Sequence, residues 1–151
     1  MLEGSGLLAR ACACHFQDEP DVMIHAAGVS NSTCITAAEF DREKLRLIRN
    51  LNSHLGLGRF IYFSTCSVDD PHNRQTPYVK HKLAMEDIVK SHPRHLIVRL
   101  PQLAGRTPNP HTLLNYLYAR IARSEQISIW EEARRNILDV DHVAQTVAFL
   151  A

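Results

Sequence analysis

The sequence has no long hydrophobic run, no surplus of one charge and few cysteines. Its 151 residues include 17 Lys and Arg against 16 Asp and Glu, for a formal net charge of +1. This balance removes the electrostatic reason to expect nucleic acid or an anionic membrane surface as a partner. No apolar stretch approaches the roughly 20 residues that span a bilayer, and the N-terminus lacks the basic-then-apolar pattern of a signal peptide. We therefore expect a cytoplasmic protein without membrane insertion.

The four cysteines give little support for disulfides, a metal site or a catalytic thiol. They are Cys12, Cys14, Cys34 and Cys66, and none belongs to a Cys-x-x-Cys pair. Without a secretion signal, reduced thiols are the default. Cys12 and Cys14 with His15 could hold a metal, but their spacing fits no common zinc pattern, so we expect no metal. Cys66 could be a nucleophile, but no local signature supports that role, and a small buried apolar residue is the favoured interpretation.

Short apolar runs alternate with helical patterns along the chain. The length and a hydrophobic fraction of 45% are those of one globular domain. The expected strands are 21–26, 59–63 and 95–100, with shorter extended segments at 127–130 and 135–140. The expected helices are 10–16, 40–55 (stopped by Gly56 and Gly58), 77–92, 112–124 (with Leu113, Leu114, Leu117, Ile121 and Ala122 inward) and a last one capped by Asp141. This alternation predicts an α/β fold with a parallel sheet.

Parallel sheets bind ligands beyond the carboxyl ends of their strands. That rule places the 26–32 loop, Thr65 and the 101–110 loop around one crevice. Tyr78 and Lys82 follow on the same rim, because Pro77 begins the next helix just before them. The sequence therefore predicts a polar site at this edge of the sheet.

Tyr78 and Lys82 are four residues apart, a spacing that puts both on one face of a helix. A neighbouring ammonium favours the phenolate form of a tyrosine, and such a tyrosine can exchange a proton with a substrate hydroxyl. Taken alone, such a pair is more often a surface lysine that packs its stem along a half-buried tyrosine. The hydroxyls of Ser64 and Thr65, at the end of the preceding strand, favour the proton-transfer interpretation.

A series of short motifs spans nearly the whole chain. They are Gly4-x-Gly6-x-x-Ala9, Val22 to Gly28, Phe63-Ser64-Thr65, Tyr78-x-x-x-Lys82, Val98-Arg99-Leu100-Pro101 with Gly105, and Arg135 to Ala144. In this order they resemble the extended short-chain dehydrogenase/reductase family, and its NAD-dependent epimerase/dehydratase branch is the best match. No single motif is decisive, but their joint order is specific.

The resemblance implies a site and a cofactor. Thr65 would hydrogen-bond the reacting hydroxyl or carbonyl, Tyr78 would be the general acid/base, and Lys82 would lower the tyrosine pKa and bind the nicotinamide ribose. The cofactor would be NAD or NADP. The implied cofactor-binding residues are Gly4, Gly6 and Ala9 at the phosphate-binding turn, His25, Ala26 and Ala27 along the cofactor, Lys82 at the ribose, and Leu100, Pro101 and Gln102 near the nicotinamide. Arg135 would hold a substrate phosphate.

The implied function is proton and hydride transfer on a sugar hydroxyl or ketone of a nucleotide sugar. The compact start resembles that of a short subgroup from bacterial surface-polysaccharide gene clusters, which implies a role in polysaccharide biosynthesis. Related enzymes often dimerise through helices equivalent to 40–55 and 77–92. Two alternatives stay open: a degenerate Rossmann-like domain that binds a nucleotide or a protein partner without catalysis, and a reductase of an unrelated small ketone.

The chain departs from the family pattern at its start. Only Met1 to Glu3 precede the glycine turn, and the gap from Gly6 to Val22 is too short for the usual second and third strands. We expect one NAD(P)-binding Rossmann-like domain over residues 1–151, with its first strand clipped, its second and third strands absent and its last helix cut short. NAD and NADP cannot be distinguished, because the acidic residue that follows the missing strand is lacking. Cys66 and Ser67 replace the Asp-Glu pair of sugar 4,6-dehydratases, which argues against that reaction.

Overall fold

The computed structural model describes residues 1–55, 58–129, 131–132 and 134–151. A four-stranded parallel sheet has the order β1-β2-β3-β4, and a two-stranded parallel sheet pairs β5 with β6. The strands are β1 (Leu2–Glu3), β2 (Val22–His25), β3 (Arg59–Thr65), β4 (His95–Leu100), β5 (Gln102–Ala104) and β6 (Ile137–Asp139). The helices are α1 (Leu7–Ala13), α2 (Ala37–His54), α3 (Pro77–Val89), α4 (Leu113–Ala122) and α5 (Val140–Leu150), with a 3₁₀ turn η1 (Cys66–Asp69). This arrangement confirms the predicted Rossmann-like α/β class.

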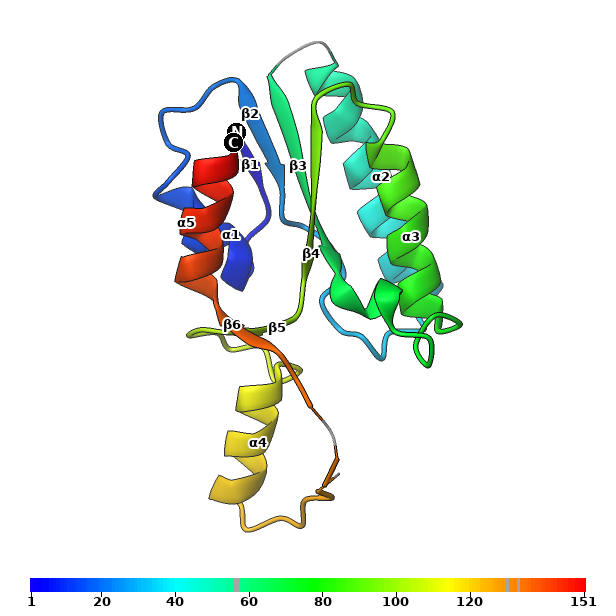
Figure 1. Cartoon of the computed structure of the whole chain (residues 1–151), viewed down its shortest axis with the longest axis vertical. Helices are drawn as coiled ribbons and strands as arrows, with labels where there is room; N and C mark the ends of the chain where they lie inside the picture. Colours follow the sequence, from blue (N-terminus) through cyan, green and yellow to red (C-terminus); the bar gives the residue numbers. More distant parts are fainter. Residues whose placement is uncertain (56–57, 130, 133) are drawn as a thin grey trace.

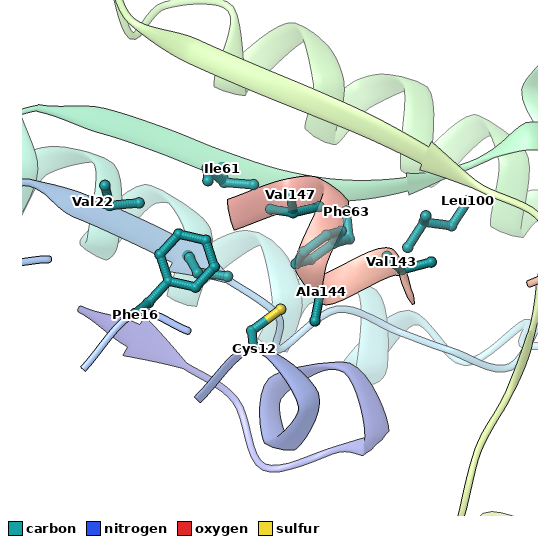
Figure 2. Packing of buried hydrophobic residues seen from close by; sticks show 10 residues of the cluster. Cys12, Phe16, Val22, Ile61, Phe63, Leu100, Val143, Ala144 and Val147 are labelled. Atoms are coloured by element: carbon teal, nitrogen blue, oxygen red, sulfur yellow. The ribbon is translucent and has the colours of Figure 1, made fainter. Parts of the chain in front are cut away.

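Helices cover both faces of the larger sheet. α1 and α5 lie on one face, and α2 and α3 lie side by side on the other (Figure 1). β3 therefore sends alternate side chains into two cores: Ile61 and Phe63 pack with α1 and α5 (Figure 2), whereas Phe60 and Tyr62 pack toward α2 and α3. Burial on both faces explains why this strand is a continuous apolar run rather than an alternating one.

β1 is short but continues the ladder. Its two residues pair with β2 in the register Leu2↔Ile24 and Glu3↔His25. The Ile24 N–H donates to the Met1 carbonyl at 2.8 Å and the Ala26 N–H donates to the Glu3 carbonyl at 2.8 Å. The predicted clipped first strand is thus present as two residues, and it places the glycine turn beside the carboxyl end of β2.

Two predictions about the C-terminal third were wrong. The helix predicted at 112–124 with an inward apolar face forms as α4, but none of its residues is buried, and Leu114 and Ile121 are 44% and 67% exposed. α4 extends away from the larger sheet, beyond β5 and β6 (Figure 1). Periodicity defines an apolar face, but it does not supply the element that would cover it. Residues 127–129 form no strand, and Trp130 lies outside the described residues.

Helix boundaries differ by a few residues from the prediction. α1 begins and ends three residues earlier than predicted, α2 begins three residues earlier, and α3 ends at Val89 rather than near 92. α2 ends before Gly56, which lies outside the described residues. Asp139, not Asp141, caps α5: its side chain accepts from the Asp141 N–H at 2.9 Å and from the His142 N–H at 3.4 Å. The predicted extended segment 135–140 contains β6.

Candidate active site

The N-terminus of α3 fixes the tyrosine and the lysine. The Thr76 hydroxyl accepts a hydrogen bond from the Val79 N–H at 3.3 Å, and Pro77 occupies the first turn. Both features are typical helix starts. Tyr78 is consequently in the first turn and Lys82 lies one turn later. Both side chains are buried, with 7% and 3% of their residue surface exposed.

Thr65 reaches the same place from the end of β3. Its hydroxyl oxygen accepts from the Ser67 N–H at 3.2 Å, which caps η1, and its side chain is close enough to Tyr78 to lower the pKa of that phenol. The Lys82 Nζ lies 6.0 Å from the centre of the Tyr78 ring. The structure therefore brings Thr65, Tyr78 and Lys82 together at one end of the sheet.

A buried carboxylate from α2 organises this site. Glu43 is fully buried, and its Oε1 accepts hydrogen bonds from the Tyr62 hydroxyl at 2.7 Å and the Lys82 Nζ at 2.9 Å. Its Oε2 accepts from the Val29 N–H at 2.7 Å and lies 3.0 Å from the His81 Nε2. The Lys82 Nζ also donates to the Tyr62 hydroxyl at 3.1 Å. One carboxylate thus joins α2, β3, α3 and the loop after β2.

This network keeps Glu43 ionised. Burial by itself would raise the pKa of the Glu43 carboxyl, but the hydrogen bonds from His81, Val29 and Tyr62 and the charge of Lys82 outweigh it. The pKa of Glu43 is therefore held well below its usual range. Burial, the Glu43 charge and the hydrogen bond to Glu43 raise the pKa of Tyr62 well above its usual value, so Tyr62 stays neutral and donates to the carboxylate.

The predicted lowering of the tyrosine pKa is wrong for this arrangement. Burial and the nearby Glu43 carboxylate raise the pKa of Tyr78 to about 12, and the hydrogen bond with Thr65 opposes them only in part. The main physical reason is burial of the phenol, and the Glu43 carboxylate, which is paired with Lys82, adds to it. Tyr78 is a neutral phenol at neutral pH.

The loop after β2 passes close over the ion pair. A Cβ on Gly28 would lie 2.7 Å from the Lys82 Nζ and 2.9 Å from the Glu43 Oε1, so a side chain here would push the paired groups aside. Val29 packs in a small apolar cluster with Tyr78. On the outer side of this loop is a pocket of about 420 Å³, lined by loop residues between 28 and 36 and by His111. Lys82 is not among the residues that line this pocket.

The predicted phosphate-binding turn lies at the end of β1. Gly4 has φ of +136°, and a Cβ there would be 2.6 Å from the Ala26 carbonyl oxygen, so the turn packs tightly on the end of β2. A Cβ added at Gly6 would have no other atom within 4 Å. Ala9 is buried. A second pocket, of about 400 Å³, lies over this region and is lined by α1 residues, Gly105, Arg106 and residues 139–141. The glycine turn is therefore accessible on its outer side.

The other predicted cofactor residues line the ends of β2 and β4. His25 is 1% exposed; its Nδ1 lies 3.1 Å from the Asn50 Nδ2, and its Nε2 has no hydrogen-bond partner among the described residues. Burial lowers the pKa of His25 to about 4, so the ring is neutral. The remaining predicted residues are buried or half-buried: Ala26, Ala27, Leu100, Pro101 and Gln102. Their contact with a cofactor stays a prediction.

Arg135 lies apart from this site. It is exposed, and its Nη1 donates to the Arg134 carbonyl at 2.9 Å. It lines neither of the two pockets described above. The structure does not place Arg135 beside Thr65, Tyr78 and Lys82, and its role in binding a substrate phosphate stays a prediction.

The cysteines and metals offer no competing site among the described residues. Cys66 is exposed, not buried as expected, and burial of its sulfur and the Asp69 charge raise the pKa of its thiol. Burial raises the pKa of the Cys12 thiol to about 11. Both thiols are thus poor nucleophiles near neutral pH. In the described part of the chain no three His, Cys, Asp or Glu side chains come together as metal ligands, and no helix is long and apolar enough to cross a bilayer.

Sequence reasoning missed Glu43, Tyr62 and His81. A signal for Glu43 was present, because Phe40, Glu43 and Leu47 follow one another at helical spacing on the same face of α2. A carboxylate on an apolar helix face needs a buried partner. The identity of that partner depends on how α2 packs against α3, which no local pattern contains.

Comparisons with known proteins identify the family and the fold. The family model described as the NAD-dependent epimerase/dehydratase family matches residues 5–151. The fold resembles the Bordetella bronchiseptica enzyme WbmH in complex with NAD+, with 18% identity over 95% of this chain and 52% of that chain, and a TM-score of 0.67. It also resembles RMD from Pseudomonas aeruginosa complexed with NADPH, with 21% identity, 88% and 55% coverage and a TM-score of 0.63.

A third similar structure is the Bordetella bronchiseptica enzyme WbmG in complex with NAD and UDP, with 15% identity, 93% and 50% coverage and a TM-score of 0.61. No curated protein sequence gives a significant match. The chain spans about half the length of these solved structures. The family match covers nearly all of the chain. The chain belongs to the NAD-dependent epimerase/dehydratase family.

Proposed function

We propose that this protein carries out NAD(P)-dependent proton and hydride transfer on a sugar hydroxyl or ketone of a nucleotide sugar, through Thr65, Tyr78 and Lys82. The observation that carries the proposal is the meeting of these three side chains at the carboxyl end of β3, where Thr65 lowers the pKa of Tyr78 and the Lys82 Nζ lies 6.0 Å from the centre of the Tyr78 ring. Family membership supports the reaction class. The NAD+, NADPH and UDP in the solved structures of similar fold support the classes of cofactor and substrate.

The roles follow from the contacts of each side chain. A bound nicotinamide dinucleotide supplies the hydride chemistry. Tyr78 exchanges a proton with the substrate oxygen, and Thr65 hydrogen-bonds the same oxygen. The Lys82 ammonium uses two of its three hydrogens on Glu43 and Tyr62, so one remains for a ligand hydroxyl.

The ionisation state of Tyr78 decides which proton transfer it is ready for. Its pKa is raised to about 12, so its phenol carries a proton at neutral pH. A protonated tyrosine is ready to give its proton to a carbonyl oxygen as hydride arrives at the carbon. Oxidation of a hydroxyl is the same proton transfer in reverse, and it needs the phenol to lose its proton first.

The residues of the turn after β1 fit a dinucleotide phosphate. Gly6 leaves free space where a side chain would project, and the adjacent pocket of about 400 Å³ is bordered by Arg10 and Arg106. These features support the proposed contacts of Gly4, Gly6 and Ala9. A role in surface-polysaccharide biosynthesis and a homodimer through α2 and α3 rest on the family resemblance.

Cofactor titration tests the proposal. Isothermal titration calorimetry with NADH and with NADPH should show binding of at least one at micromolar to millimolar concentration. With a set of nucleotide-sugar ketones as substrates, Tyr78→Phe should abolish turnover and leave dinucleotide affinity nearly unchanged. Absence of binding of either dinucleotide at millimolar concentration would overturn the redox function.

The alternative is a domain that binds a nucleotide without catalysis. It is favoured by the burial of Tyr78 and Lys82, because neither side chain lines a described pocket. In that case the dinucleotide, or UDP alone, would bind, no substrate would be turned over, and Tyr78→Phe would change nothing but stability. Measuring affinity and turnover on the same two proteins separates the two functions.

A further inference from the structure

We propose that Glu43 is a positioning residue of this site: its buried carboxylate holds the Lys82 ammonium against Tyr62 and beneath Gly28, and so governs how Tyr78 exchanges its proton. The inference rests on the proposed roles of Tyr78 and Lys82, and it adds a residue on a different helix that acts through the lysine.

The geometry around the Glu43 carboxylate fixes the position of Lys82. Four donors converge on it: the Val29 N–H, the Tyr62 hydroxyl, the His81 ring and the Lys82 ammonium, at 2.7 to 3.0 Å. They come from a loop, β3 and α3, while Glu43 itself lies on α2. Full burial makes each hydrogen bond directional and costly to break. The position of Lys82 is therefore set by Glu43 rather than by solvent.

The Lys82 side chain has little room to take another conformation. Lys82 is 3% exposed, and Gly28 packs over its Nζ without room for a side chain. Of its three hydrogens, one goes to Glu43 and one to Tyr62. A shift of the carboxylate would move the ammonium, because no other described acceptor bonds it.

The charged and titratable groups around Tyr78 come from every packed element. α2 contributes Glu43, β3 contributes the neutral Tyr62, and α3 contributes His81 and Lys82. On β2, His25 is neutral. The Glu43 charge is the one that raises the pKa of Tyr78. Neutralising it without changing its shape should therefore ease ionisation of Tyr78 while loosening Lys82.

Lysine labelling tests the contact without cofactor or substrate. Reductive methylation followed by mass spectrometry should leave Lys82 unlabelled in the wild type, while exposed Lys90 reacts. In Glu43→Gln, labelling of Lys82 relative to Lys90 should rise by about tenfold or more, the factor for losing about 1.4 kcal/mol of pairing. Asp41→Asn is the matched control, since it neutralises an exposed carboxylate on the same helix and should change nothing.

Tyrosine titration tests the effect on proton exchange. Phenolate absorbance is followed against pH, and the curve of the matching Tyr78→Phe protein is subtracted to leave the ionisation step of Tyr78. In Glu43→Gln this step should lie about one pH unit lower than in the wild type. Circular dichroism at each pH confirms that both proteins are folded. A purely structural role for Glu43 would alter stability without moving this step.

Glu43→Asp keeps the proposal testable if the glutamine variant does not fold. It retains the charge but shortens the reach, so Lys82 labelling should rise while the Tyr78 step stays near its wild-type position. The proposal is overturned if Lys82 stays unlabelled in both folded variants, or if the Tyr78 step does not move in Glu43→Gln. Because neither readout needs a dinucleotide, failure of cofactor binding would sink the redox function and leave this result standing.

Discussion

The Lys82 ammonium lies 2.9 Å from the Glu43 carboxylate and 6.0 Å from the centre of the Tyr78 ring. The lysine that the sequence pairs with the tyrosine four residues away is thus engaged by a glutamate from another helix. Burial and this carboxylate raise the pKa of Tyr78, and the pairing makes the site depend on the packing of α2 against α3.

Removing the lysine alone should be more damaging than removing both charges. Lys82→Met leaves the Glu43 carboxylate buried without its cation, which should lower the free energy of unfolding by about 3–5 kcal/mol. Adding Glu43→Gln should restore part of that loss, because no unpaired buried charge remains. Urea unfolding of the wild type, both single variants and the double variant measures the coupling. Additive losses would mean that the two side chains act independently.

His25 should make stability depend on pH between about 6.5 and 4. Burial, with smaller contributions from the charges of Lys82, Arg46 and Arg49, lowers its pKa to about 4 in the folded protein, although Glu43 opposes the shift. The unfolded state therefore binds the proton first, and stability should fall as pH drops through this window, by up to about 3 kcal/mol. Denaturant unfolding from pH 7.5 to 4.5 measures it. In His25→Gln, which cannot titrate, this part of the slope should disappear.

Substitution by alanine should destabilise the protein at Gly28 but not at Gly6. Gly28→Ala places a Cβ within 2.7 Å of the Lys82 Nζ, so stability should fall by about 1–3 kcal/mol. Gly6→Ala meets no atom within 4 Å and should change stability by less than about 1 kcal/mol. If the turn holds a dinucleotide phosphate, Gly6→Ala should nevertheless weaken NADH binding in calorimetry. An unchanged affinity would place the phosphate elsewhere.

Thr65→Val should show what the Thr65 hydroxyl contributes, because valine keeps the shape of the side chain but lacks the hydroxyl. The Thr65 hydroxyl lowers the pKa of Tyr78, so its loss should move the phenolate absorbance step further upward. The Ser67 N–H would also lose its acceptor, which should reduce stability by about 1 kcal/mol. Thr65→Ser is the control, because it keeps the hydroxyl and should retain both properties. Equal behaviour of the two variants would contradict a role for the hydrogen bond.

The main strands and the start of α3 were predictable because local chemistry specifies them. The buried strands are continuous apolar runs, and Thr76 with Pro77 marks the helix start independently of distant contacts. The order of motifs likewise placed Thr65, Tyr78 and Lys82 on one rim. By contrast, the exposed face of α4 depends on which neighbours are present, and periodicity contains no such information. The cap at Asp139 is a local contact, which the prediction placed two residues too late at Asp141.

By itself the sequence determined the family, the parallel sheet and the three side chains at its carboxyl edge, since these follow from residue order and helical or strand spacing. Only the tertiary structure decided the charge balance at that edge. Glu43 comes from a helix 39 residues before Lys82 in the chain, and a contact over that separation is made by packing, not by local pattern. Because an ionisation equilibrium responds to every charge within a few ångströms, the pKa of Tyr78 is a property of the folded assembly of α2, β3 and α3.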